Sequence, residues 1–417
     1  MAPDANSLAS HLQQSLSIPD DEASSHNSRE SSTAEIGSSL SPLANDFRPT
    51  FGPAPPPFIV ATSFYEKREI HNKGTGLVAL RDIPVGTRII CEPPLLTIPY
   101  NLTTLVWDQY CQLSLEDKHV YDNLSYHPHL NAHLRQPGQI SSSSENSKID
   151  GDADEEGDAI RVTQIFASNN LVIAKGAHGV FRETSRINHS CVPNVHHSFS
   201  PDLKKEVVHA ARDICAGEEL LTTYMGQAGI FSTRAQRTEY LRTNYGFTCQ
   251  CPACTDITGV SDAHRMLLNS LVYGIEQFRK GSDGVCDTKP KSLSEARSQA
   301  IDIIGTLLTD GLSGTELVRA YRLASELAVD DKDFEQALEF AVKELEVECN
   351  LMGMERDDLK RKGLASEQWI AEIQEKQREM MLQERKKLKH AKKNQNRKGE
   401  GQEKRKHMKT GGFKSNE

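Results

Sequence analysis

Three cysteines stand close together in the segment CQCPAC, at Cys249, Cys251 and Cys254. The whole chain of 417 residues has nine cysteines, so three within six positions form a dense cluster. Thiolates at this spacing are typical of a tetrahedral zinc site, which has four ligands when it is closed and structural. The segment supplies three, and spacing alone does not choose the fourth among Cys191, Cys215, Cys286 and the histidines. The alternative interpretation is a chance cluster of buried thiols.

A second polar cluster lies in RINHSCVPN, residues 186–194, where Asn188, His189 and Cys191 nearly adjoin. An amide, an imidazole and a thiol in such a row fit neither a helix stripe nor a strand face. Taken alone, the segment predicts a crowded polar loop that contains one thiol without an assigned role.

Two further segments carry candidate residues that also have ordinary structural explanations. Gly74, Thr75 and Gly76 in KGTGL would let the backbone approach a ligand, although a lone G-x-G is more often a hairpin turn. Tyr224 closes the strand-like ELLTTY, a place where tyrosine most often packs with its hydroxyl satisfied.

Two aromatic residues precede the cysteine cluster, Tyr245 and Phe247 in NYGFTC. On an extended segment they share one face, where they either wall a ligand or, by default, fill the core. No competing catalytic pattern is present, because the chain has neither a phosphate-binding Gly-rich loop ending in Lys-Ser/Thr nor a G-x-S-x-G nucleophile elbow.

The composition favours a soluble globular protein with disordered extensions, since 37% of residues are hydrophobic and 26% are charged. The sequence has no apolar run long enough to span a membrane and no secretory signal, so we expect the cysteines to be intracellular thiols. A net charge of −9 argues against nucleic-acid binding by the whole chain. This average hides a basic segment, residues 376–409, with 14 Lys or Arg against 4 Asp or Glu.

Changes in composition and hydrophobic pattern along the chain predict four regions. Residues 1–57 form a disordered arm, and residues 58–256 form a β-rich domain that has a helical stretch at 105–134 and an acidic, solvated loop at about 136–159. Residues 261–356 are helical, either a tetratricopeptide-like repeat or an ordinary bundle. Residues 357–417 form a charged basic tail, as helix or coil.

The order of the motifs carries more information than any one of them. A G-x-G, then NHSCxPN, then GEEL…TY, then YxFxCxCxxC resembles the SET-domain protein lysine methyltransferases. More closely, the chain resembles a fungal branch related to the SET and MYND family but without a MYND finger. It implies an α+β fold, with a β-rich SET domain and a post-SET zinc site followed by an all-α domain.

The resemblance also implies a role for each candidate residue. The cofactor would be S-adenosylmethionine, held by Gly74, Thr75, Gly76, Asn188, His189 and Phe247. Asn169 would be a further contact, although the stretch SNN leaves the matching position open by one residue. Tyr224 would be catalytic at the methyl-transfer pore, where it also touches the cofactor, and Tyr245 would wall the substrate channel. Cys191 would be the fourth ligand of one structural zinc ion, with Cys249, Cys251 and Cys254.

These expectations define the predicted function. The chain would transfer methyl groups to a lysine of a histone or another protein, in the nucleus or also in the cytoplasm. The basic run 385–409 would act in nuclear import, or as a weak anchor to nucleic acid or an acidic surface. The rival hypotheses are a non-catalytic SET-fold scaffold that recruits chromatin partners and an enzyme acting on other amines.

Overall fold

The computed structural model describes residues 63–99, 102–127, 152–173, 176–282, 286–353 and 365–410, without side-chain detail at 152–156, 227 and 394–410. Contacts divide the chain into the units Met1–Ser63 and Phe64–Glu417, and every described helix and strand lies in the second. The arm expected at 1–57 falls outside the described residues.

The described strands are short, as the Gly- and Pro-broken apolar runs predict. They are β1 (Tyr65–Ile70), β2 (Gly74–Ala79), β3 (Arg88–Glu92), β4 (Leu96–Ile98), β5 (Leu171–Val172), β6 (His178–Val180), β7 (Asn188–His189), β8 (Val195–Ser200), β9 (Lys205–Ala210) and β10 (Leu221–Thr222). Their pairing gives a β1–β2 hairpin, two three-stranded sheets in the orders β3-β9-β8 and β4-β6-β5, and the pair β7–β10.

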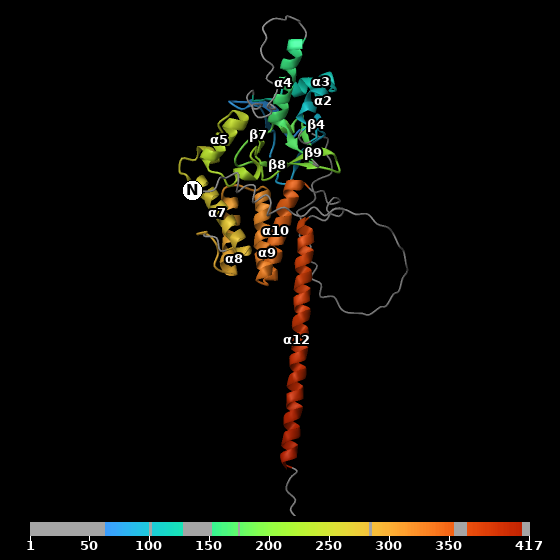
Figure 1. Ribbon diagram of the computed structural model, residues 1–417, viewed down its shortest axis with the longest axis vertical. Helices are drawn as coiled ribbons and strands as arrows, with labels where there is room; N and C mark the ends of the chain where they lie inside the picture. The colour runs from blue at the N-terminus through green and yellow to red at the C-terminus, as the bar shows by residue number, and fades with distance from the viewer. Residues whose placement is uncertain are drawn as a thin grey trace, which may run out of the picture. The chain divides into compact units, whose positions relative to one another are not determined.

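The described helices surround and follow these sheets (Figure 1). The α-helices are α2 (Val106–Cys111), α3 (Leu115–Asp122), α4 (Asp152–Asn169), α5 (Arg234–Tyr245), α6 (Pro252–Thr255), α7 (Val260–Arg279), α8 (Leu293–Thr309), α9 (Thr315–Asp330), α10 (Phe334–Met352) and α12 (Ala365–Thr410). Short 3-10 turns are η1 (Thr103–Leu105), η4 (Thr184–Arg186) and η5 (Gly226–Gly229). None of the described helices has the length and apolar character needed to cross a membrane.

Helix α4 differs from the loop expected at 136–159, because it already begins at Asp152. Further along, Val162, Ile165 and Phe166 recur at helical spacing and are buried in a cluster with residues of α2 and β4. Polar composition alone concealed this docked helix, while residues 136–150 lie outside the description.

The helical stretch expected at 105–134 is shorter and broken. Helix α2 ends at Cys111, and Ser114 then starts α3 by accepting a hydrogen bond from the Asp117 amide at its N-terminus. Helix α3 ends at Asp122, and residues 128–134 are not described.

Part of the segment expected as a tail is docked on the helical region, while the expected boundary at residue 357 falls outside the described residues. Helix α12 is anchored in the helical region by Trp369 and Ile373, which are buried with residues of α9 and α10. The Trp369 indole donates a hydrogen bond of 2.8 Å to the Ser325 hydroxyl on α9. Beyond this anchor, residues 381–393 are exposed, in keeping with a charged tail.

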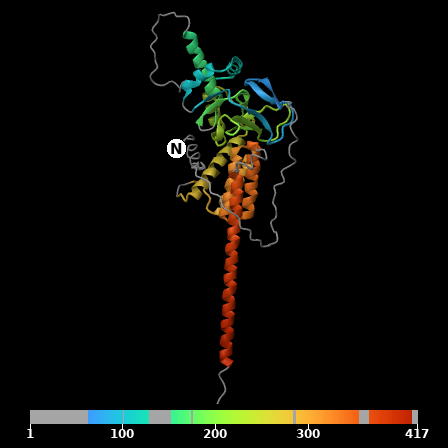
Figure 2. The ribbon, with the colours of Figure 1, turned by 90° about the vertical axis from the view of Figure 1, so that its right-hand side faces the viewer.

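The helical region is joined to the sheets through α10. Helices α7 to α10 pack in sequence, and α10 also contacts β8 and β9 (Figure 2). Apolar residues of α7, α8 and α9 form one buried cluster, as their helical periodicity predicts. The tetratricopeptide-like alternative for this region stays a prediction.

Candidate active site and metal centre

Two distant motifs meet in the parallel pair β7–β10. Asn188 lies opposite Leu221, and His189 lies opposite Thr222. The Ser190 amide extends the pairing with a hydrogen bond of 2.8 Å to the Thr222 carbonyl. As a result, the NHSC segment runs beside β10, which ends two residues before Tyr224.

A cavity of about 420 Å³ opens beside this pair. Its volume falls in the range of roughly 300–1,000 Å³ that is usual for small-molecule and cofactor sites. The sequence-predicted residues that line it are Thr75, Asn169, Asn188, His189, Tyr224, Tyr245 and Phe247, together with the metal candidates Cys249 and Cys251. Gly74 and Gly76 are not among the lining residues.

Gly76 does not line the cavity, but its lack of a side chain leaves space for residues that pack beside the cavity. A Cβ at this position would lie 2.8 Å from the Asn188 side-chain nitrogen and 2.9 Å from a carboxylate oxygen of Glu219. Only glycine therefore leaves room for the Asn188 amide to donate its hydrogen bond of 2.9 Å to Glu219. The same carboxylate pairs with the ammonium of Lys73 at 2.6 Å, and Lys73 lines the cavity.

Asn169 borders the cavity but uses its amide group within the protein. Its Nδ2 donates to the carbonyls of Ser125 at 2.7 Å and Ile165 at 2.8 Å. Asn170 does not line the cavity and instead bonds His178 through Oδ1 at 2.6 Å. Of the two registers that the sequence leaves open, Asn169 is therefore the one at the cavity.

Aromatic rings form one wall of the cavity. The ring of Tyr224 lies 4.9 Å from that of Tyr245 and 5.3 Å from that of His189, and Phe247 lies 6.0 Å from His189. The Tyr224 hydroxyl donates a hydrogen bond of 2.9 Å to the Ile187 carbonyl. Burial raises the pKa of Tyr224 and raises that of Tyr245 to about 12, so both phenols stay protonated at neutral pH.

His189 connects this wall to the cysteines. The Tyr224 amide donates a hydrogen bond of 3.0 Å to His189 Nδ1, so the ring proton is on Nε2. Nε2 lies 3.3 Å from the sulfur of Cys191 and donates to it. Burial lowers the pKa of His189 to about 4, which keeps the imidazole neutral.

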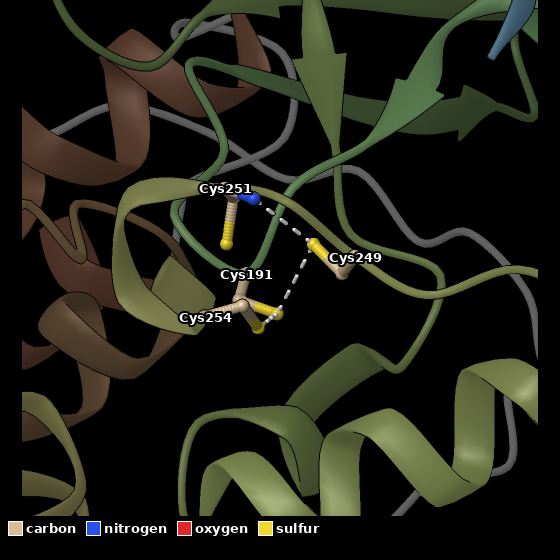
Figure 3. A group of neighbouring side chains, drawn as sticks. All are labelled: Cys191, Cys249, Cys251 and Cys254. Carbon is tan, nitrogen blue, oxygen red and sulfur yellow. Dashed lines mark hydrogen bonds between the residues drawn. The ribbon is translucent and has the colours of Figure 1, made fainter. Parts of the chain in front are cut away.

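Cys191, Cys249, Cys251 and Cys254 converge in a buried cluster (Figure 3). Their four sulfur atoms lie within 4.8 Å of one another, and Cys191 lies 3.5 Å from Cys254 and 4.0 Å from Cys249. Zn–S bonds of about 2.3 Å in a tetrahedron place sulfurs about 3.8 Å apart, so the four thiols fit zinc. Without a metal ion the thiols share their protons: hydrogen bonding with Cys191 lowers the pKa of Cys251 and of Cys254, while hydrogen bonding with Cys249 raises the pKa of Cys191.

Local structure explains how a short segment supplies three of these sulfurs. Gly246 ends α5 in the left-handed region, with φ of 75°, and turns the chain back towards the cavity. Pro252 then starts the single-turn helix α6, whose N-cap is Cys251. Cys251 and Cys254 are three residues apart and therefore face the same side of this turn.

The other candidates for the fourth ligand are not in the cluster. Cys215 is exposed and Cys286 is only partly buried, and neither belongs to the one group of possible metal ligands within the described ranges. Sequence reasoning missed Lys73, which lines the cavity, and Glu219, which pairs with Lys73. Their signals were present, because Lys73 directly precedes the G-x-G motif and Glu219 lies in GEEL before Tyr224.

Comparison with known proteins gives the family. Residues 74–225 match the SET domain model. The chain is 32% identical over 287 residues to histone-lysine N-methyltransferase set5 of Schizosaccharomyces pombe, a match covering 68% of this chain and 77% of the relative. The chain belongs to the SET-domain family of protein-lysine methyltransferases.

Other relatives of this SET-domain chain match over a shorter span. Histone-lysine N-methyltransferase SET5 of Scheffersomyces stipitis is 45% identical over 78 residues, which cover 18% of this chain and 16% of that protein. Protein-lysine N-trimethyltransferase SMYD5 of Gallus gallus is 40% identical over 76 residues, which cover 18% of each chain. Among solved structures, the SET domain of LSMT bound to lysine and AdoHcy is 13% identical, with coverage of 77% of this chain and 91% of that one and a TM-score of 0.28.

The SET match contains the cavity residues from Thr75 to Tyr224 and also Cys191, and it ends at residue 225, while Lys73 lies just before it. Phe247 and the other three cysteines follow the matched span. The positions of Phe247, Cys249 and Cys251 at the cavity, and of Cys254 in the cysteine cluster, come from the geometry of α5 and α6 and do not depend on that match.

Proposed function

We propose that the chain is an S-adenosylmethionine-dependent protein-lysine N-methyltransferase that acts on a histone or another protein lysine. The observation that carries this proposal is the β7–β10 pair, which sets Asn188, His189 and Tyr224 around one cavity. The names of the relatives, which include histone-lysine and protein-lysine methyltransferases, support the same reaction class.

The lining of the cavity fits a ligand with an aromatic base and a polar amino acid end. Phe247 and Tyr245 provide ring faces, while Asn188, Lys73 and Thr75 provide polar groups. We assign the base to the Phe247 side and the amino acid end to the loop before β2. When bound, S-adenosylmethionine supplies a methyl group on a cationic sulfonium.

The substrate lysine must be neutral to react, since its ammonium form has no lone pair and its pKa in water is about 10.4. The partly buried channel beside Tyr224 and Tyr245, next to the positive charge that a bound sulfonium brings, disfavours a second positive charge on the amine and lowers this pKa. The Tyr224 hydroxyl and the Ile187 carbonyl, 2.9 Å apart, provide oxygens that orient the amine. Catalysis would then be mainly a matter of positioning.

Cofactor binding tests this proposal through Asn188. Asn188→Ala should weaken S-adenosylmethionine binding at least about tenfold, because it removes a polar cavity group held by Glu219. Isothermal titration calorimetry on the full chain measures the affinity. Asn269→Ala on α7 is the matched control, since Asn269 does not line the cavity, and it should bind as wild type does. No binding by the wild type would favour the non-catalytic scaffold.

We also propose that the four clustered cysteines hold one structural zinc ion. The sulfur separations and the burial of the cluster support this assignment. The link from Cys191 through His189 to the Tyr224 amide means that the metal would steady the cavity wall.

For the basic end of the chain, we propose a role in nuclear import. Deleting residues 385–417 should reduce nuclear accumulation of a tagged protein and leave methyl transfer intact, because the anchor of α12 at Trp369 and Ile373 is retained. Fluorescence microscopy beside a methyl-transfer assay checks both parts. Deletion of 411–417 alone leaves the basic run in place and serves as the control. An unchanged distribution of the longer truncation would count against import.

A further inference from the structure

Two arginines beside the cysteine cluster are fully buried. Arg237 of α5 and Arg265 of α7 both have 0% exposure. A guanidinium stays charged in a protein, and a buried charge is costly unless it is paired or compensated. Neither residue lies in the cavity. Their burial therefore needs a negative charge nearby.

Arg237 reaches the cluster directly. Its Nη2 donates to the Ala253 carbonyl at 3.0 Å and lies 3.8 Å from the Cys254 sulfur. Its Nη1 lies 3.4 Å from a carboxylate oxygen of Asp262, whose side chain is about one-third exposed. This long, partly solvent-exposed contact with Asp262 neutralises only part of the positive charge of Arg237.

The positive charge of Arg265 is less well compensated than that of Arg237. Its donors go to backbone carbonyls, those of Gly229 at 2.9 Å, Ile230 at 3.1 Å and Cys191 at 3.0 Å. In the part of the chain that the structure describes, no carboxylate lies within ion-pair distance of it. Carbonyl dipoles satisfy its hydrogen bonds but do not neutralise its charge.

The cysteine cluster provides the missing charge if it binds zinc. Four thiolates around one Zn²⁺ carry a net charge of −2, which matches two guanidinium groups. Two disulfides or four neutral thiols would carry no charge and would leave the two cations with only the long contact of Arg237 to Asp262 and the more distant charge of Asp310 near Arg265. A metal thiolate is therefore the state of the cluster that complements the two arginines best.

We propose that Arg237 and Arg265 balance the charge of the zinc tetrathiolate, and that Arg265 thereby couples zinc binding to the docking of α7 on the NHSC loop. This inference rests on the zinc site proposed above. Arg265 bonds the carbonyl of a zinc ligand, Cys191, and belongs to the first helix of the helical region. The metal would then hold α7 as well as the cavity wall.

Zinc affinity measures this role directly. Arg265→Gln should raise the zinc dissociation constant of the full chain about 10–100-fold, as is typical when a group supporting metal ligands is lost. Competition with a chromogenic chelator gives the constant. Hydrogen exchange on the same samples should show faster exchange in α7 for the variant and for wild type stripped of zinc.

Arg279→Gln is the matched control, because Arg279 is an exposed arginine of the same helix that pairs with Glu326 at 2.6 Å. It should keep the zinc affinity of wild type. One zinc per wild-type chain must be measured first, which separates failure of the zinc site from failure of this inference. Given that zinc, a folded Arg265→Gln with unchanged affinity would overturn the proposal.

A second variant decides the matter if Arg265→Gln does not fold. Arg265→Lys keeps a cationic side chain but loses the fork that donates to three carbonyls, so its zinc dissociation constant should rise by less than about tenfold. A rise of about 100-fold or more in a folded Arg265→Lys protein would overturn the proposal, because a retained cation would then give no compensation.

Discussion

Tyr224→Phe is expected to lower kcat for lysine methylation about 10²-fold, a loss typical of removing one positioned polar group from a transition state. The change removes a hydroxyl that donates to the Ile187 carbonyl at 2.9 Å and lines the cavity. Its ring contacts with His189 and Tyr245 remain, so the wall should keep its shape. Radiolabelled methyl transfer under saturating cofactor measures kcat.

The substitution should lower kcat but leave the affinity for the cofactor nearly unchanged, and this difference makes the prediction specific. Affinity for S-adenosylmethionine, measured by calorimetry, should change by less than about threefold, because the phenol acts on the amine more than on the cofactor. Tyr273→Phe on α7 is the control, since Tyr273 is 37% exposed and lies outside the cavity lining. A Tyr224→Phe protein with wild-type kcat would remove Tyr224 from the catalytic machinery.

Cys191→Ser is expected to lower zinc content and stability together. Structural zinc contributes to folding directly, so the free energy of unfolding should fall by about 4 kcal/mol or more. Because Cys191 also accepts the hydrogen bond of His189 at 3.3 Å, cofactor affinity should fall with the metal. Zinc analysis by mass spectrometry and chemical denaturation measure the two effects.

Cys215→Ser is the matched control for this substitution, because Cys215 is an exposed thiol outside the cluster. It should keep one zinc and wild-type stability. If Cys191→Ser instead kept a full zinc ion, the fourth ligand would have to be another residue. Cys215 and Cys286 would then be the next to substitute.

The sequence predicted much of the site because the motifs carry its chemistry in short segments. The three cysteines at 249–254 show their spacing directly, and α6 needs only one turn to orient two of them. Spacing could not choose Cys191, since its approach depends on the β7–β10 pair between distant segments. The family resemblance supplied that assignment, and the cluster geometry agrees with it.

The parts that sequence reasoning missed are those whose role depends on tertiary burial. Arg237 and Arg265 look like ordinary charged residues of surface helices, and their burial appears only once α5 and α7 are packed in the folded chain. Similarly, the acidic start of α4 and the charged α12 suggested loop and tail. A few buried residues, among them Ile165 and Trp369, dock these helices, and composition averages conceal them.

Methyl transfer by the full chain tests the central claim most directly. Purified protein would be incubated with S-adenosylmethionine carrying an isotopically labelled methyl group and with a panel of histones and cell-extract proteins, followed by mass spectrometry of modified peptides. The account predicts labelled methyl groups on lysine side chains with wild type, and their near absence with Tyr224→Phe. Wild-type protein that carries zinc and binds the cofactor but labels no lysine in the panel would contradict it.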